Sequence, residues 1–129
     1  MSDKRSPQHK RPLVLVAEDD PGIRVTLEVM LDIEGYGVIL AADGQEAVAM
    51  AKERLPDVIL LDGLMPKLDG RQVLEELRSH DATECIPVLI LSGMTPSSDD
   101  EWQGAEFVGK PFEPSDLLSR IREITASSR

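Results

Sequence analysis

The sequence lacks several features that would place it in well-defined classes of protein. It has one cysteine, Cys85, which excludes an internal disulfide framework and is typical of a reducing compartment. We interpret that cysteine as a small residue near the start of a strand, not as a reactive thiol. No apolar run approaches the roughly 18 residues of a membrane span, and the first short run leads straight into acidic residues, unlike a signal peptide. We therefore expect a cytoplasmic protein that makes no contact with a membrane.

Positive charge is also scarce, except at the start of the chain. The 14 lysine and arginine residues face 24 aspartate and glutamate residues, which gives a net charge of −10. Residues 1–11 hold four of the basic residues and one acid, a local +3, so the rest of the chain carries −13. Nucleic-acid binding needs a basic face, so we exclude it for the folded part. We predict a disordered basic tail over residues 1–11, one domain over 12–126 and a C-terminal tail over 127–129.

Short apolar runs alternate with amphipathic helical patterns along the whole domain. Asp20 and Pro21, for example, are typical of the cap and first residue of a helix, and apolar residues at helical spacing follow until Gly35. The expected strands cover residues 13–17, 36–42, 57–61, 86–91 and 106–109, and a helical pattern follows each. Five such units predict an α/β fold, a doubly wound parallel sheet with right-handed crossovers and helices on both faces. The third run is the most apolar, which favours a central strand.

Acidic residues follow two of the apolar runs at the point where each strand should end. Glu18 and Asp19 come directly after the first run, and Asp62 comes directly after the third. The carboxyl ends of parallel strands meet at one edge of a sheet, where such folds bind ligands, so we expect these three carboxylates to converge. Adjacent acids also favour a helix start, and that interpretation is the better one for Asp20. Three clustered carboxylates repel one another strongly unless a cation compensates, which favours Mg²⁺.

Asp62 and two further strand ends predict chemistry on a phosphoryl group. The Asp62 carboxylate closes the most apolar run, a costly place for a charge, so we predict that it attacks a phosphoryl donor and forms an acyl phosphate. Ser92 follows the fourth run and Lys110 the fifth, where a hydroxyl and an ammonium would receive phosphoryl oxygens. The Lys110–Pro111 peptide is a candidate for the cis form, which would aim the lysine inward.

At this point the chain resembles the receiver domains of two-component response regulators. The blocks that carry the resemblance are, in order, LVLVAEDDPGIR, PDVILLDGLMPKLDG, VLILSG and GAEFVGKPF, and it extends from Pro12 to about Thr125. The resemblance implies a flavodoxin-like fold with five parallel strands in the order 2-1-3-4-5. It also implies phosphoryl transfer to aspartate from a sensor histidine kinase or a histidine phosphotransfer protein. Such a domain is not an enzyme in the usual sense, because it catalyses only its own phosphorylation and dephosphorylation.

The resemblance assigns roles to the acids and to one neighbouring residue. Asp62 matches the phosphoacceptor, and Glu18 and Asp19 match the acidic pair that holds Mg²⁺. Leu64, two residues past the acceptor, would add its backbone carbonyl to the metal ligands. Glu18 stands where aspartate is commoner, and its longer side chain could still reach the metal directly or through water.

Three further matches concern the switch between the two states of such a domain. Ser92 matches the hydroxyl residue that moves toward the phosphoryl group, and Lys110 matches the lysine of the site. Phe107, three residues before that lysine, matches the aromatic residue that swings inward on activation. Gly93 stands where alanine is usual, which loosens the loop that follows the hydroxyl residue.

The stretch between Ser92 and Lys110 departs most from the resemblance. It holds 17 residues, about one helical turn fewer than is usual, so we predict a shortened or irregular fourth helix within residues 96–104. Ser98 and Glu101 would form a capping box at its start. In the family this helix belongs to the signalling face, so the downstream protein is unknown, and a homodimer is one candidate assembly. A stand-alone regulator and a receiver from a longer chain both fit the sequence.

Two apolar residues should flank the phosphoryl group. Leu64 and Met94 each lie two residues past a residue of the site, Asp62 and Ser92 respectively. We expect them to exclude or misorient the water that hydrolyses the acyl phosphate, so that the phosphorylated state decays slowly.

Two other functions compete with that of a phosphoacceptor. A haloacid-dehalogenase-type phosphohydrolase also uses a nucleophilic aspartate, Mg²⁺ and a lysine, but it needs a second acid where this chain has Leu64. A phosphorylation-independent binding module would be a receiver that has lost its chemistry, whereas here the acids, the hydroxyl and the lysine form a complete set.

Overall fold

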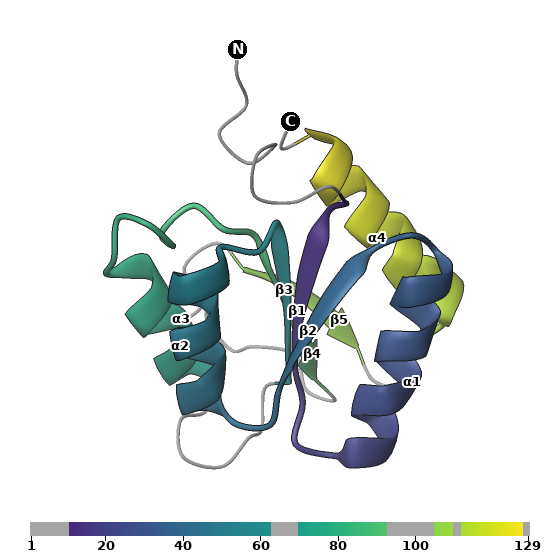
Figure 1. Cartoon of the computed structure of the whole chain (residues 1–129), viewed down its shortest axis with the longest axis horizontal. Coiled ribbons are helices and arrows are strands. Elements are labelled where there is room, and N and C mark those ends of the chain that lie inside the picture. Colours follow the sequence, from purple (N-terminus) through teal and green to yellow (C-terminus); the bar gives the residue numbers. More distant parts are fainter. Residues whose placement is uncertain (1–10, 63–69, 93–104, 110–111, 128–129) are drawn as a thin grey trace.

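A parallel sheet of five strands forms the middle layer of the structure (Figure 1). The structure is a computed structural model, and it describes residues 11–62, 70–92, 105–109 and 112–127. The strands are β1 (Leu13–Ala17), β2 (Gly37–Ala41), β3 (Val58–Asp62), β4 (Val88–Ser92) and β5 (Glu106–Gly109). Their order in the sheet is β2-β1-β3-β4-β5, and every neighbouring pair is parallel. The flavodoxin-like order 2-1-3-4-5 is therefore confirmed, with β3 in the centre as expected.

Four described helices cover the two faces of the sheet. They are α1 (Pro21–Ile33), α2 (Gly44–Arg54), α3 (Gly70–Arg78) and α4 (Pro114–Ser127). Helices α1 and α4 lie on one face, and α2 and α3 lie on the other (Figure 1). Helix α1 begins where predicted, because the Asp20 carboxylate accepts hydrogen bonds from the amides of Gly22 and Ile23.

Three strands begin later than predicted: β3 begins at Val58, one residue late, and β2 and β4 are delayed by local turns. The Tyr36 amide donates to the carbonyl of Leu31 at the end of α1, so β2 starts one residue later than predicted. The Ile86 amide donates to the carbonyl of Thr83, and Pro87 has no amide hydrogen, so β4 starts two residues later. Local turns therefore decide where β2 and β4 begin.

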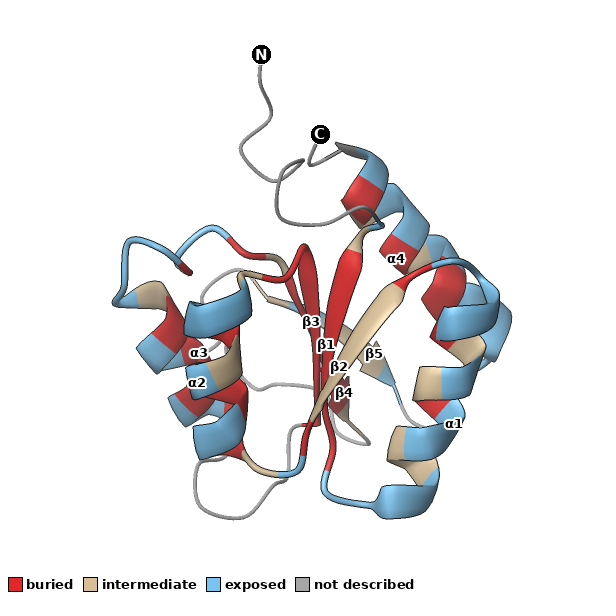
Figure 2. Cartoon of the chain, viewed as in Figure 1, coloured by how far each residue is buried: buried red, intermediate tan, exposed pale blue. Residues whose placement is uncertain are grey.

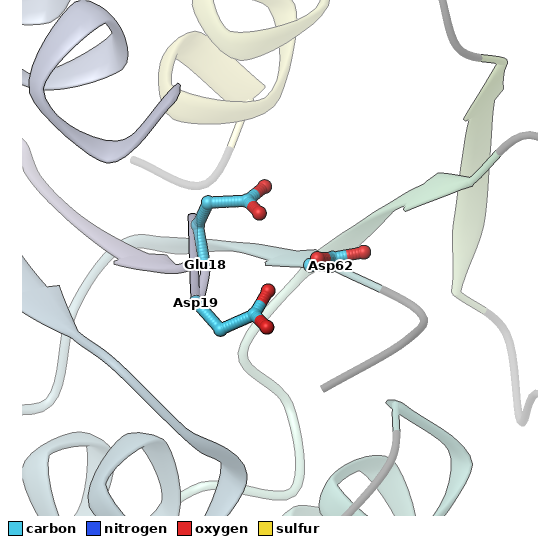
Figure 3. Close-up of side chains that lie close together, drawn as sticks. All are labelled: Glu18, Asp19 and Asp62. Atoms are coloured by element: carbon cyan, nitrogen blue, oxygen red, sulfur yellow. The ribbon is translucent and has the colours of Figure 1, made fainter. Parts of the chain in front are cut away.

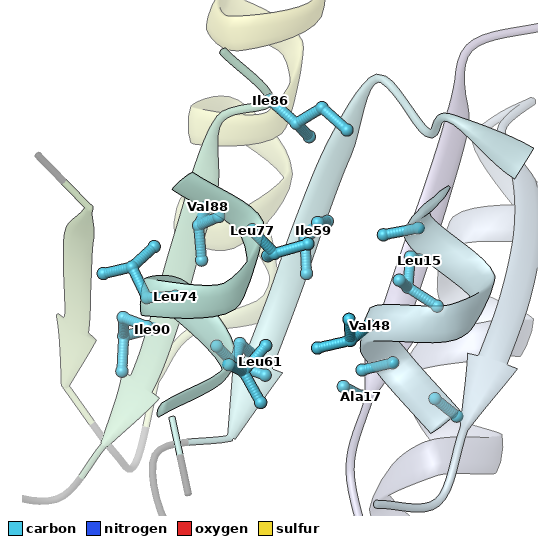
Figure 4. Packing of buried hydrophobic residues seen from close by; sticks show 14 residues of the cluster. Leu15, Ala17, Val48, Ile59, Leu61, Leu74, Leu77, Ile86, Val88 and Ile90 are labelled. Carbon is cyan, nitrogen blue, oxygen red and sulfur yellow. The ribbon is translucent and has the colours of Figure 1, made fainter. Parts of the chain in front are cut away.

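The two central strands, β1 and β3, are buried on both faces, as continuous apolar runs predict (Figure 2). Alternate residues point to opposite sides, so Leu15 and Ile59 belong to one apolar cluster and Val14 and Leu60 to another. The first cluster lies between the sheet and helices α2 and α3 (Figure 4). Each buried leucine or isoleucine contributes about 1.5–3 kcal/mol, so the two clusters hold the strand ends firmly.

A buried acid fixes the relative position of these two strands. The Asp57 carboxylate accepts a hydrogen bond of 2.7 Å from the amide of Leu13, and the Asp57 amide donates to the Leu13 carbonyl at 2.8 Å. Both bonds stand at the amino ends of the strands, in the register that pairs the last residue of β1 with Leu61. The next residues along each strand direction, Glu18 and Asp62, therefore lie next to each other at the carboxyl edge.

Some predictions concern residues at the margins of the described structure. The predicted helix within residues 96–104 lies outside the described residues, as do residues 1–10 of the predicted basic tail.

Arg11, the last residue of the predicted tail, is exposed, and its Nη1 lies 3.9 Å from Oδ1 of Asp32 on α1. Among the helices that the structure describes, none is both long enough and apolar enough to pass through a bilayer.

Candidate functional site

Three carboxylates meet at the carboxyl edge of the sheet (Figure 3). Glu18 and Asp19 follow β1 directly, and Asp62 is the last residue of β3, one residue beyond the predicted strand. One carboxylate oxygen of each residue lies within 4.8 Å of the other two. Glu18 is 1 % exposed and Asp62 is 6 % exposed, whereas Asp19 is open to solvent. The structure thus brings together the three acids that the sequence predicts to converge.

The charge and the donor atoms of this cluster suit a divalent cation. Two unit charges 4 Å apart repel by about 4 kcal/mol at an effective dielectric constant of ~20, and two of these three carboxylates are buried. Oxygen atoms are the ligands that Mg²⁺ prefers, and Mg²⁺ keeps several waters, for which the exposed side of Asp19 leaves access. The residues present therefore fit the magnesium ion that the sequence predicts.

Hydrogen bonds hold the turn that carries two of these acids. The Glu18 amide donates to the carbonyl of Ala41 on β2 at 3.1 Å, and the Asp20 amide donates to Oε2 of Glu18 at 3.3 Å. The Arg24 guanidinium, one turn into α1, donates from Nη1 to the backbone carbonyl of Glu18 at 2.8 Å. The acids therefore stand on a short, hydrogen-bonded turn that connects β1 to the capped start of α1.

The hydroxyl and aromatic residues of the predicted switch lie on β4 and β5. Ser92 is the last residue of β4, is partly exposed and pairs in register with Gly109, the last residue of β5. Phe107 is half-buried and packs against the apolar cluster between the sheet and helices α2 and α3. Parallel pairing therefore puts the end of β5 beside Ser92 at the same edge as the acids. Four further predicted residues lie outside the described residues: Leu64, Met94, Lys110 and Pro111.

Sequence reasoning missed two residues that shape the site, Arg24 and Asp57. A positive side chain near the start of a helix interacts unfavourably with the positive end of the helix dipole. Arg24 stands at such a position, which is a signal in the sequence that it has another role. The hydrogen bond between Asp57 and Leu13 depends on the pairing of β1 with β3, which no local pattern contains. Both contacts join residues that the sequence alone does not place together.

Comparisons with known proteins agree with this geometry. Residues 14–122 match the family model of the response regulator receiver domain. A probable transcriptional regulator, ycf27, of Porphyridium aerugineum is 40 % identical over an alignment of 115 residues that covers 86 % of this chain and 47 % of that protein. The chain spans about half the length of the curated relatives that it matches.

Solved structures resemble the chain over nearly their whole length. The chemotaxis protein CheY4 of Vibrio cholerae is 31 % identical with a TM-score of 0.81, and the match covers 88 % of this chain and 98 % of that one. A receiver domain of a sensor histidine kinase from Pseudomonas aeruginosa was crystallised with a magnesium ion coordinated in its active site cleft. It is 30 % identical with a TM-score of 0.82, and the match covers 90 % of this chain and 98 % of that one.

Proposed function

Because the chain belongs to the response regulator receiver domain family, we propose that it accepts a phosphoryl group from a phosphohistidine protein on Asp62 and signals through altered protein contacts. The observation that carries this proposal is the meeting of the Glu18, Asp19 and Asp62 carboxylates at the ends of β1 and β3. We assign the receiver to residues 12–126, with a basic tail before it and a short tail over 127–129 after it, the first residue of which, Ser127, is still the last residue of α4. The reaction would take place in the cytoplasm.

Asp62 would act as the nucleophile. A carboxylate oxygen of Asp62 forms a bond to phosphorus while the bond from phosphorus to the imidazole nitrogen of the donor breaks. The electron pair of the broken bond stays on that nitrogen, which takes up a proton, and the product is an acyl phosphate. Because Asp62 ends a buried strand and is 6 % exposed, its carboxylate is held in place, and positioning is a large part of the catalysis of phosphoryl transfer.

We assign the metal ligands to the carboxylates of Glu18, Asp19 and Asp62 and to the backbone carbonyl of Leu64. When bound there, Mg²⁺ would neutralise charge on the phosphoryl oxygens. Glu18 is buried and its backbone is tied to β2, so it would set the position of the ligand group. Asp19 is exposed, which leaves the open side of the site to the incoming phosphoryl group.

Ser92 and Lys110 would receive two of the phosphoryl oxygens, the first by hydrogen bonding and the second by charge. A cis Lys110–Pro111 peptide would aim the lysine at the site. Movement of Ser92 toward the phosphoryl group would let Phe107 swing inward from its half-buried position. A downstream protein, or a second copy of the chain, would bind the surface that this movement changes. The net charge of −10 favours protein partners over nucleic acid for this domain.

The phosphoryl donor would contact the outer side of α1. Val25, Val29 and Ile33 follow one another at a spacing of four residues and are 51 %, 51 % and 75 % exposed. Because α1 begins at Pro21, directly after the turn that carries the acids, a protein bound along it would bring a phosphohistidine to the edge that holds Asp62. We therefore place the sensor histidine kinase or histidine phosphotransfer protein on this apolar line.

Phosphorylation by a small donor tests the proposed function. Incubation with acetyl phosphate and Mg²⁺ should add one phosphoryl group to the intact mass, and Asp62→Asn should abolish the adduct. Asp81→Asn, which removes an exposed acid in the loop between α3 and β4, should leave the adduct unchanged. A wild-type protein without an adduct would instead favour the phosphorylation-independent binding module. Sustained release of phosphate from small esters would favour a phosphohydrolase.

A further inference from the structure

We infer that Arg24 is a positioning residue for the acids of the site. The inference rests on the proposed function, because it concerns how the chain orients its Mg²⁺ ligands before any phosphoryl group arrives. Its basis is the hydrogen bond of 2.8 Å from Nη1 of Arg24 to the backbone carbonyl oxygen of Glu18. Arg24 is partly buried and lies in the first turns of α1.

The accepting carbonyl belongs to the peptide bond that joins the two adjacent acids. A peptide unit is planar, so this carbonyl oxygen and the Cα atoms of Glu18 and Asp19 move as one rigid group. A hydrogen bond that holds the oxygen therefore restricts the directions in which both side chains leave the backbone. One of these side chains is buried and the other is exposed, yet their carboxylates lie within 4.8 Å of each other and of Asp62.

Other hydrogen bonds of the turn act on its two ends. The bond from the Glu18 amide to Ala41 fixes the peptide before the acids, and the capping bonds of Asp20 fix the start of α1 after them. The bond from the Asp20 amide to the Glu18 carboxylate is 3.3 Å long, beyond the usual range for an amide donor. The bond from Arg24 is shorter and has a charged donor, which makes it stronger than a neutral one. It acts on the peptide between the two acids.

A guanidinium beside an acidic site also has a charge effect, and that effect has the opposite sign. Its positive charge repels a divalent cation, so a charge effect alone would make removal of Arg24 tighten Mg²⁺ binding. A positioning effect makes removal weaken Mg²⁺ binding, because the acids must then be ordered when the ion binds. Arg24 is partly exposed, where water and salt screen its charge, so we expect positioning to dominate. The sign of the change in affinity separates the two effects.

The test is the Mg²⁺ affinity of the unphosphorylated protein, measured from amide NMR signals in a Mg²⁺ titration. Loss of a group that orients metal ligands typically weakens metal binding about 10- to 100-fold. Because Arg24 acts through one backbone carbonyl, we expect Arg24→Met to weaken Mg²⁺ binding by about 10-fold, at the low end of that range. Arg24→Lys keeps the charge and a donor but loses the planar fork of the guanidinium. Its Mg²⁺ affinity should therefore lie between that of the wild type and that of Arg24→Met.

Arg78 offers a matched control at the opposite edge of the sheet. Its Nη1 donates to the carbonyl of Ile86, just before β4, at 2.9 Å, and this contact is also partly buried. Arg78→Met should lower the thermal stability about as much as Arg24→Met, yet leave the Mg²⁺ affinity at the wild-type value. The two variants together therefore separate an effect on the site from a general loss of stability.

Wild-type or tighter Mg²⁺ binding in Arg24→Met would overturn the inference, and a wild-type adduct on Asp62 would then show that the proposed function still stands. If the wild-type protein bound no Mg²⁺, the proposed metal site and the inference would both be wrong. Should Arg24→Met fold poorly, Arg24→Lys gives the same comparison, because a charge effect alone leaves its affinity unchanged and a positioning effect lowers it.

Discussion

Glu18 stands where aspartate is commoner in receiver domains, and the structure shows how the chain accommodates the longer side chain. Its carboxylate accepts a hydrogen bond from the amide of Asp20, so the side chain turns back toward the backbone of its own turn. The residue is 1 % exposed and lies beside the nearly buried Asp62, so two carboxylates of like charge stand close together in a largely buried place. We therefore expect the metal-free site to be less stable than the site with a bound cation.

Glu18→Gln should raise the stability of the metal-free protein and remove most of the stabilisation that Mg²⁺ provides. Glutamine keeps the shape of the side chain and an acceptor for the Asp20 amide, but it removes one of three clustered charges. A relief of about 1 kcal/mol, well below the ~4 kcal/mol of a fixed pair 4 Å apart, would raise Tm by about 4 °C. Thermal unfolding in EDTA and in saturating Mg²⁺ measures both effects.

The control for this prediction is Glu84→Gln, which removes one negative charge from an exposed loop position and should change Tm very little. A metal-free Glu18→Gln protein that unfolds at a lower temperature than the wild type would contradict the prediction. That result would mean that the buried carboxylate is compensated by its neighbours within the protein.

At the residue scale, the acids are predictable from the sequence but the contacts that orient them are not. Glu18, Asp19 and Asp62 can be recognised because each follows an apolar run, and parallel strands bring such positions to one edge. Arg24 and Asp57 act on backbone atoms of other segments, so their roles appear only when the register of β1 with β3 and the angle of α1 are known.

At the scale of elements, apolar runs predict the strands because a strand buried on both faces has no polar side to interrupt it. The first residues of the strands are less predictable, because the amides of Tyr36 and Ile86 donate hydrogen bonds within local turns and not to a neighbouring strand. The pattern of alternating strands and helices predicts a parallel sheet, but it does not tell which strand neighbours which. The order 2-1-3-4-5 was implied by the family resemblance and is confirmed by the pairing.

Helix α1 has one apolar line that packs and another that does not. Leu27 and Leu31 are buried against the sheet, whereas Val25, Val29 and Ile33 are among the exposed residues. An amphipathic helix needs only its packed stripe to be apolar, so the second line has no role in holding the described fold. It is therefore the part of α1 that a donor protein can bind without disturbing the core.

Val29→Lys should slow phosphoryl transfer from a phosphohistidine protein about 10-fold, because a charge at the centre of an apolar contact costs on the order of 1–2 kcal/mol. Phosphorylation by acetyl phosphate should be unchanged, since a small donor needs no docking surface. A panel of phosphohistidine proteins would first be tested on the wild type. The protein that phosphorylates the wild type fastest would then be used to measure the rates. Ala49→Lys, at an exposed position of α2, is the matched control. Equal losses with both kinds of donor would indicate a damaged site and contradict the docking surface.

At the scale of the whole molecule, the described strands differ in how firmly they are held. All residues of β1 and β3 are buried, whereas β5 is exposed or half-buried along its length. Arg120 of α4 forms an ion pair with Glu106 of β5, so a displacement of β5 would be passed on to that helix. The acceptor therefore lies on a fully buried strand, whereas β5 has fewer buried residues and should open at a lower free-energy cost. This asymmetry favours β5 as the strand that responds to phosphorylation, and its ion pair with Arg120 connects it to α4.

The duration of that response depends on the lifetime of the acyl phosphate. Leu64 and Met94 are proposed to flank it with apolar surface, so that no side chain orients the hydrolytic water. Leu64→Asn combined with Met94→Glu supplies groups that hydrogen-bond water, and one such bond of about 1.4 kcal/mol would accelerate phosphate loss about 10-fold. Intact mass, followed over time after removal of acetyl phosphate, measures the decay. Decay in the double variant at the wild-type rate or below it, with thermal stability matched, would show that apolar flanks do not set the lifetime.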